Sequence, residues 1–181
     1  NEILEKTEKI IKKITKEAPI GLRPPWLYCN ESIYKIAQER NYKWISNLYT
    51  PLISKLYRPD LKSAFFQDKI KSCFLKYKRI RYNKKPFKIN SLLQIPLLSL
   101  MDGDMLGVMD PEQKINELWL DSAFKSLKEQ YHNSKNYFNL NFHPWIIGTA
   151  NRSILLDNIL IYLKDKNCRF ITAKDSLKIY K

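Results

Sequence analysis

The sequence predicts an α/β protein in which helices alternate with the strands of a parallel sheet or barrel. Short runs with strand character precede or follow each predicted helix, at residues 20–22, 42–46, 92–100, 137–142 and 168–171. Apolar residues recur at helical spacing over residues 3–16, 30–37, 111–127 and 151–166. Because the two kinds of segment alternate, a parallel arrangement is favoured over separate sheets and bundles.

The ends of the predicted helices carry recognisable signals. Pro19 ends the first helix, and Asn30 is a suitable N-cap for the second. Asp110 is the predicted N-cap of the third helix, with Pro111 in its first turn. The fourth helix, over residues 151–166, is followed at once by the last predicted strand. These signals support the alternation from one end of the chain to the other.

The stretch at residues 48–90 breaks this regularity. It is rich in Tyr, Phe and Pro, has one short helical pattern at residues 61–75, and contains a basic cluster of Lys76, Lys78, Arg79, Arg81, Lys84 and Lys85. We expect residues 1–181 to form part of a single domain, with residues 48–90 as an irregular basic insertion.

The composition describes a globular chain with a strong positive charge. The chain has 181 residues, of which 44% are apolar and only 4 are Gly. This length and apolar content are enough to build a sizeable core. A net charge of +14 favours contact with polyanions such as nucleic acid, acidic glycans or an anionic membrane surface, although a well-solvated surface would give the same excess. The charge alone does not choose among these partners.

Three classes of protein are disfavoured by simple counts. Cys29, Cys73 and Cys168 are widely separated and form no CxxC pair, so neither a disulfide framework nor a thiolate zinc site is expected. The longest apolar run, residues 92–101, is interrupted by polar residues and proline and is too short to span a bilayer.

The chain opens at Asn1 directly in a helical pattern, and we expect a further N-terminal part to precede it. Cell envelope and cytoplasm both remain open as locations.

A first candidate motif is the sequence Gly-Leu-Arg-Pro-Pro-Trp at residues 21–26, at the end of a predicted strand. Its two prolines stiffen the backbone and could hold the guanidinium of Arg23 and the indole of Trp26 in fixed positions. An Arg held in this way can orient a carboxylate through two hydrogen bonds. The alternative is an ordinary turn with a surface Arg and a core Trp.

A second candidate motif places His143 at the end of an alternating strand, before Pro144 and Trp145. A histidine there could act as a general acid, since the ordinary pKa of histidine, near 6.5, suits proton transfer at neutral pH. The alternative is a structural histidine that caps the strand. In a barrel, both motifs would lie at the carboxyl ends of strands, where catalytic residues gather.

A metal site cannot be assembled convincingly from this chain. Only two histidines are present, and neither has a carboxylate at ligand spacing, so no metal-binding residues are predicted. We expect His132 to be a solvated surface residue, and Asp102 and Asp104 to be turn residues.

In this order and spacing, the two motifs resemble those of the polysaccharide deacetylases, the NodB-like carbohydrate esterases. In that family one strand ends in Arg-x-Pro-aromatic and a late strand ends in His-Pro. The block from Phe138 to Gly148, followed by Arg152 and the helix at residues 155–163, is the most specific part of the resemblance. Gln94–Leu97 and Met101–Gly103 resemble a further segment of bacterial members.

The resemblance implies the C-terminal part of a distorted (β/α) barrel that holds a divalent metal, usually zinc, in the complete domain. A metal-bound water would attack the acetyl carbonyl of a peptidoglycan-like or other acetylated polysaccharide, with an Asp as base. By analogy His143 would protonate the leaving group and Arg23 would orient the base. Pro25, Trp26 and Trp145 are the predicted substrate-binding residues.

Two departures from the family pattern matter. The family's Asp-pair and His-pair motifs have no counterpart before Arg23, so we expect this chain to bind no metal and to be inactive alone. Asn47 stands where many relatives carry an Asp that partners the late His, and an amide cannot supply its charge. Two alternatives to an enzyme therefore stay open: a glycan-binding relic of the same fold, and a nucleic-acid-binding module built on the basic cluster, which lacks a recognised motif.

Overall fold

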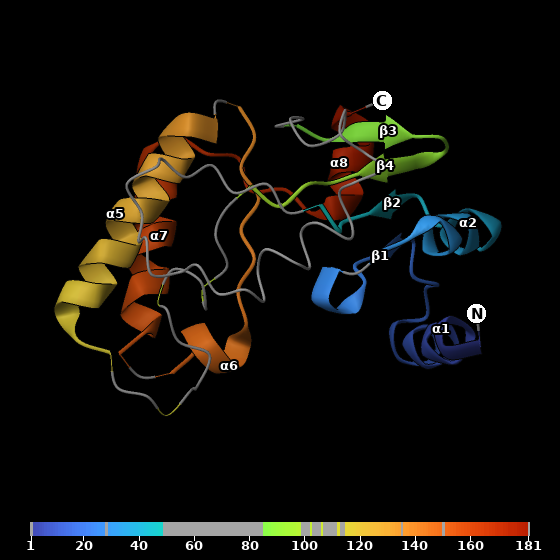
Figure 1. Ribbon diagram of the computed structural model, residues 1–181, viewed down its shortest axis with the longest axis horizontal. Helices are drawn as coiled ribbons and strands as arrows, with labels where there is room; N and C mark the ends of the chain where they lie inside the picture. Colours follow the sequence, from blue (N-terminus) through green and yellow to red (C-terminus); the bar gives the residue numbers. More distant parts are fainter. Residues whose placement is uncertain are drawn as a thin grey trace. The chain divides into compact units, whose positions relative to one another are not determined.

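The computed structural model describes residues 2–27, 29–48, 85–98, 115–134, 136–149 and 151–180, together with Asp102, Leu106 and Glu112 (Figure 1). The chain divides into two compact units. In the described residues, the first unit comprises residues 2–48, 85–96 and 171–180, and the second comprises the described residues between 97 and 170. Of the irregular insertion predicted at residues 48–90, the basic cluster lies outside the described residues except for Lys85, and residues 87–89 form a regular strand where no regular structure was expected.

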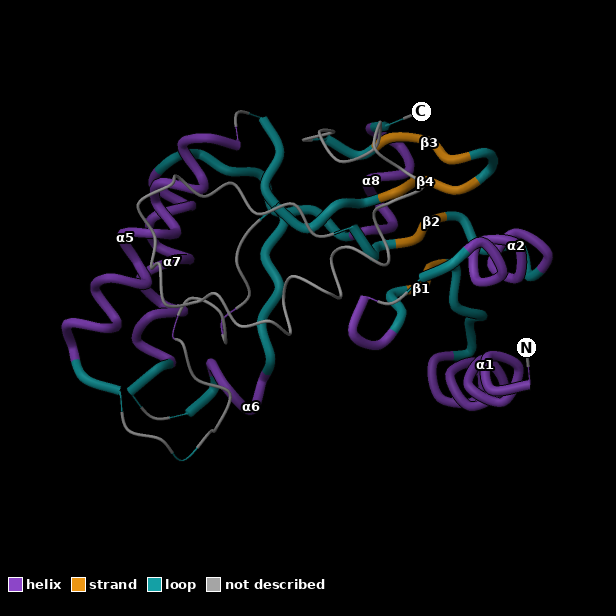
Figure 2. Tube along the Cα trace, in the orientation of Figure 1, coloured by secondary structure: helices purple, strands orange, loops and turns teal. Residues whose placement is uncertain are grey.

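The first unit is built on a small mixed sheet with the strand order β1-β2-β4-β3 (Figure 2). Strands β1 (Gly21–Leu22), β2 (Trp44–Ile45) and β4 (Leu92–Gln94) are parallel, whereas β3 (Phe87–Ile89) pairs antiparallel with β4. Asn90 takes a left-handed backbone conformation, with φ of 53°, in the tight turn between β3 and β4. The predicted α/β class is thus confirmed, but the sheet is mixed and not wholly parallel, and a barrel is not seen among the described residues.

The helices of the first unit are α1 (Glu2–Thr15), the 3₁₀ turn η1 (Pro25–Leu27), α2 (Glu31–Glu39) and α8 (Ala173–Ile179). The predicted N-cap of α2 is confirmed, because Asn30 Oδ1 accepts a hydrogen bond from the Ile33 amide at 3.0 Å. The helix packs on the sheet through a cluster of buried residues: Cys29, Tyr34, Ala37, Tyr42, Ile45 and Leu92. This cluster fixes the position of the strand ends.

The second unit contains the long helices α5 (Glu117–Ser134) and α7 (Ser153–Asp165), which pack together, and the single-turn helix α6 (Pro144–Ile147). An aromatic chain links α5 to α7. The Tyr162 ring meets the edges of Phe124 and Tyr131 at centroid distances of 5.9 and 5.6 Å. Ala123, Leu127, Leu155 and Ile159 complete the buried seam.

Several predicted elements differ from the structure. Residues 137–142 and 168–171 form no regular strand, and the backbone before His143 is irregular and extended (Figure 2). The third predicted helix is seen as α5, which begins at Glu117, where Asn116 Oδ1 accepts a hydrogen bond from the Trp119 amide at 3.0 Å. The short helix predicted at residues 61–75 lies outside the described residues. None of the described helices is long and apolar enough to cross a membrane.

Candidate functional site

A histidine and a buried carboxylate form a close pair in the described part of the chain. His143 Nδ1 lies 2.6 Å from Asp102 Oδ1, and Asp102 Oδ2 accepts a hydrogen bond from the backbone amide of His143 at 2.7 Å. The Asp102 side chain has no exposed surface, whereas 23% of the His143 side chain remains exposed. The carboxylate is therefore held inside the protein while the imidazole reaches the surface.

The backbone of His143 is fixed from both sides. Its amide donates to Asp102, and its carbonyl oxygen accepts hydrogen bonds from the amides of Ile146 and Ile147 at 2.9 and 3.0 Å. His143 is thus the N-cap residue of α6, and Pro144 occupies the first turn, where its missing amide hydrogen costs nothing. The backbone hydrogen bonds thus fix the Cα position, and the contact between Nδ1 and Asp102 Oδ1 sets the orientation of the ring.

This geometry prepares the imidazole to pass a proton at its outer nitrogen. A carboxylate at Nδ1 favours the form in which Nδ1 carries a hydrogen, which leaves Nε2 for the reacting group. Among the residues that the structure describes, no group bonds to Nε2 of His143. The same carboxylate stabilises the positive charge when both nitrogens are protonated. The arrangement suits a general acid or base.

The prediction that Asp102 is a turn residue is wrong, because its side chain is fully buried and bonded to His143. The two residues lie 41 positions apart, and nothing local in the sequence links them. A signal was nevertheless present: Asp102 follows directly on an apolar run at residues 92–101, where a buried charge needs a partner. Of the two histidines, His132 was expected to be solvated, which left His143 as the candidate partner for such a charge.

Trp145 stands beside the imidazole on the first turn of α6. The two ring centroids are 4.9 Å apart with an angle of 53° between the ring planes, and 57% of Trp145 is exposed. An exposed indole of this kind offers a flat apolar surface with a polar edge, which suits contact with the faces of sugar rings. The structure thus brings the predicted Trp145 and His143 together, and His132 is exposed on α5 as expected.

Arg23 lies in the first unit, directly after β1 as predicted. Its Nη2 donates to the hydroxyl of Ser46 at 3.1 Å, and that hydroxyl donates to the carbonyl of Ile95 at 2.8 Å. These three residues follow the parallel strands β1, β2 and β4, so one chain of hydrogen bonds joins the carboxyl ends of the three strands. Pro25, two residues after Arg23, is exposed, and the Trp26 side chain lies outside what the structure describes.

A second set of buried polar groups occupies the same edge of the sheet. The Tyr34 hydroxyl lies 3.0 Å from both Asn47 Oδ1 and Gln94 Oε1. Asn47 is therefore hydrogen-bonded to α2 inside its own unit, and the carboxylate that pairs with His143 belongs to Asp102. Asn47 accepts a hydrogen bond but supplies no charge, as expected, and the charge beside His143 belongs to Asp102.

No three side chains among the described His, Cys, Asp and Glu residues come together as a metal-binding group. Asp102 is committed to His143 through both of its oxygens, and His132 has no ligand partner within the described residues. The described residues do not by themselves fit the three-ligand zinc site of a hydrolase. The chemistry that they support is proton transfer and orientation.

No family model, no curated protein and no solved structure matches this chain.

Proposed function

We propose that this chain supplies the proton donor of a carbohydrate deacetylase, a hydrolase that cleaves acetyl groups from the amide nitrogen or hydroxyl oxygen of a sugar polymer. The fold proposed for the complete domain is the distorted (β/α) barrel of the polysaccharide deacetylases, with this chain as its C-terminal part. The observation that carries the proposal is the pair of His143 and the buried Asp102, whose shortest contact is 2.6 Å.

The proposed role of His143 follows from the chemistry of the leaving group. When the bond between the acetyl carbon and the sugar nitrogen breaks, the nitrogen must gain a proton, because an amide anion is a very poor leaving group. Protonated His143 would donate that proton from Nε2 while Nδ1 keeps its hydrogen bond to Asp102. A general acid of this kind contributes roughly 10²- to 10⁴-fold to turnover.

Other residues would bind and orient. Trp145, next to the imidazole, would stack on the sugar ring that carries the acetyl group. Arg23 would orient the carboxylate base of the complete active site, and Pro25 and Trp26 would contact the substrate. The proposed substrate is an acetylated polysaccharide such as a peptidoglycan-like glycan. The divalent metal of the family would provide an activated water, held by motifs that this chain does not contain.

The test is acetate release by the natural protein, expressed from its complete gene. Acetylated chito-oligosaccharides and acetylated peptidoglycan fragments are incubated with wild type and with His143→Ala, and both free acetate and bound glycan are measured. The proposal predicts release by wild type and a loss of roughly 10²-fold or more in the variant. Glycan binding without any acetate release would favour the binding relic over the enzyme. Binding of nucleic acid alone would overturn both.

A further inference from the structure

Arg152 is the largest fully buried side chain in the described part of the chain. Only 1% of its surface is exposed, although it carries a permanent positive charge. A buried guanidinium is costly unless its N–H groups are paired, so a charge at this depth calls for a specific role. It belongs to the second unit and is the N-cap residue of α7.

The guanidinium reaches back to the carboxyl end of α6. Arg152 Nη1 donates to the carbonyl oxygen of Ile146 at 3.4 Å, and the Thr149 hydroxyl donates to the same oxygen at 3.1 Å. The backbone amide of Arg152 also bonds to the Thr149 carbonyl at 2.9 Å. A cation at the carboxyl end of a helix is favourably placed, because the unpaired carbonyl groups carry partial negative charge.

The other end of α6 is His143. The helix has four residues, which is a single turn, and a turn of this length has little stability of its own. Its geometry is therefore set by contacts at both ends: His143 and Asp102 at the beginning, and Arg152 and Thr149 at the end. Ile146 belongs to both sets, since its amide bonds to the His143 carbonyl and its own carbonyl accepts from Arg152.

We propose that Arg152 is a positioning residue that holds α6, and through it the His143 imidazole, in register with the Asp102 carboxylate. The geometric claim concerns this chain alone, and only its consequence for turnover rests on the proposed deacetylase function. Without the guanidinium, α6 loses the cation at its carboxyl end, and the hydrogen bond from the Ile146 amide to the carbonyl of His143 is weakened. The histidine then samples positions away from Asp102.

The experiment reads the histidine contact directly by proton NMR of the natural protein. A short hydrogen bond between imidazole and carboxylate shifts its proton far downfield, and loss of the signal in Asp102→Asn assigns it. Arg152→Met removes the donor groups while keeping the side-chain length, and Arg152→Lys keeps a charged donor. Leu127→Ala is the control: it empties part of the buried core at α5, which costs about 2 to 5 kcal/mol, and removes no hydrogen-bonding group.

We expect the downfield signal to disappear in Arg152→Met, to persist in Leu127→Ala and to return only in part in Arg152→Lys, all at matched helix content. Turnover should fall roughly 10- to 100-fold in Arg152→Met with little change in KM, because a displaced catalytic group reduces kcat.

If Arg152→Met does not fold, Arg152→Lys provides the test, and we expect its signal to be weaker than that of wild type. An unchanged signal in a folded Arg152 variant would overturn the inference. An inactive wild-type protein with the expected NMR pattern would leave the inference standing and remove only the deacetylase proposal.

Discussion

Asp102 illustrates why a single residue can decide the chemistry of the site. Both carboxylate oxygens accept hydrogen bonds from His143, one from the ring and one from the backbone amide. An amide in this place has only one acceptor oxygen, so one of the two donors would face an NH₂ group. The charge is also lost, together with its stabilising effect on a protonated imidazole.

The Asp102→Asn variant is therefore expected to lose both stability and turnover. Leaving one buried donor unpaired costs about 1 to 3 kcal/mol of unfolding free energy, and misorientation of the imidazole should lower kcat roughly 10²-fold. Urea unfolding and steady-state kinetics on the natural protein check the two effects separately. A variant with wild-type kcat would show that Asp102 only fills space.

Gly21 is required by the indole that covers it. A Cβ atom at position 21 would lie 1.7 Å from Cε2 of Trp44 on the neighbouring strand, far inside any real contact. We expect Gly21→Ala to lower the free energy of unfolding by about 1 to 3 kcal/mol, the usual cost of overpacking. The check is a double-mutant cycle measured by urea unfolding. The cost should shrink when Trp44→Leu removes the large ring, and an equal cost in both backgrounds would rule out this steric explanation.

The sequence identified His143 and Arg23 as individual residues because each stands in a recognisable local pattern. It could not identify their hydrogen-bond partners. Asp102 lies 41 residues before His143, and Ser46 lies 23 residues after Arg23. Pairs of this kind come together only through the tertiary fold, so the local pattern that identifies one residue does not identify its partner.

At the level of elements, helices were easier to predict than strands. α1, α2 and α7 have clear apolar spacing and were placed within a few residues of their observed ends. The alternating residues 137–142 were wrongly predicted as a strand, because alternation records which side chains face inward and not whether a partner strand is present. The helix α8 was missed although its capping box, Thr172 with Asp175, is visible in the sequence.

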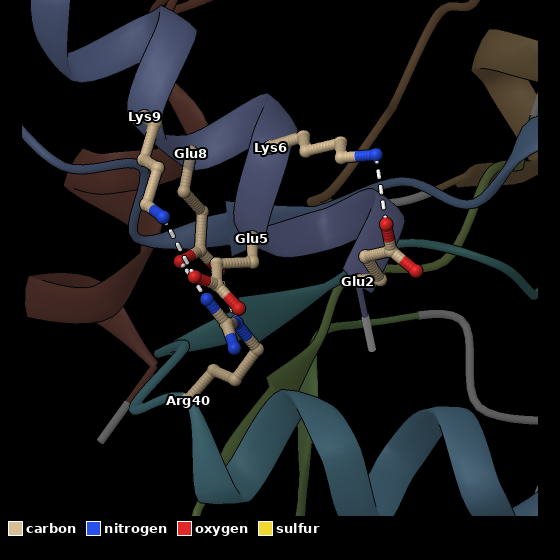
Figure 3. Close-up of polar contacts among 6 residues, drawn as sticks. All are labelled: Glu2, Glu5, Lys6, Glu8, Lys9 and Arg40. Atoms are coloured by element: carbon tan, nitrogen blue, oxygen red, sulfur yellow. Dashed lines mark hydrogen bonds and ion pairs between the residues drawn. The ribbon is translucent and has the colours of Figure 1, made fainter.

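An ion pair between Glu8 and Arg40 joins α1 to the residue that follows α2. The Glu8 carboxylate accepts two hydrogen bonds from the Arg40 guanidinium, one from Nε at 2.7 Å and one from Nη2 (Figure 3). Only 23% of the Glu8 side chain and 20% of the Arg40 side chain are exposed. The bond from Arg40 holds the pKa of Glu8 below its ordinary value of 4.5. Burial, followed by the hydrogen bond to Glu8, raises the pKa of Tyr42 to about 12, so the phenol stays neutral. The other α1 pairs, Glu2 with Lys6 and Glu5 with Lys9, are exposed and contribute little.

The docking of α1 should therefore weaken in acid. Because the folded-state pKa of Glu8 lies below 4.5, its contact contributes fully above that pH and is lost as the pH falls through the folded-state value. Urea midpoints measured from pH 7 to pH 3 should fall less steeply for Glu8→Gln than for wild type. Glu39→Gln, at an exposed carboxylate on α2, is the matched control and should follow wild type. Identical pH profiles for Glu8→Gln and wild type would contradict this assignment.

At the level of the whole molecule, the 181-residue chain should be inactive and only weakly stable by itself. Among the described strands β1 pairs only with β2, so its other edge offers backbone groups for a further parallel strand. The purified chain is expected to melt at low temperature, to release no acetate and to bind zinc no more tightly than a protein with surface histidines. Stoichiometric, tight zinc binding or a cooperative melt at high temperature would contradict this expectation.

The central claim, that His143 protonates the leaving group, predicts a dependence on what is leaving. An aryl acetate such as p-nitrophenyl acetate releases a stable phenolate that needs no proton, whereas an N-acetylated sugar releases an amine that does. Using one substrate of each kind on the same folded sample separates a chemical role from a structural one, because any loss of folded protein lowers both rates equally.

The decisive measurement is the ratio of these two rates in His143→Ala and in the wild-type natural protein. The account predicts that kcat on the acetylated oligosaccharide falls roughly 10²- to 10⁴-fold in the variant, while kcat on the aryl acetate changes by less than about tenfold. KM for the oligosaccharide should change little. Equal losses on the two substrates, or no loss on either, would show that His143 only caps α6 and would end its assignment as the general acid.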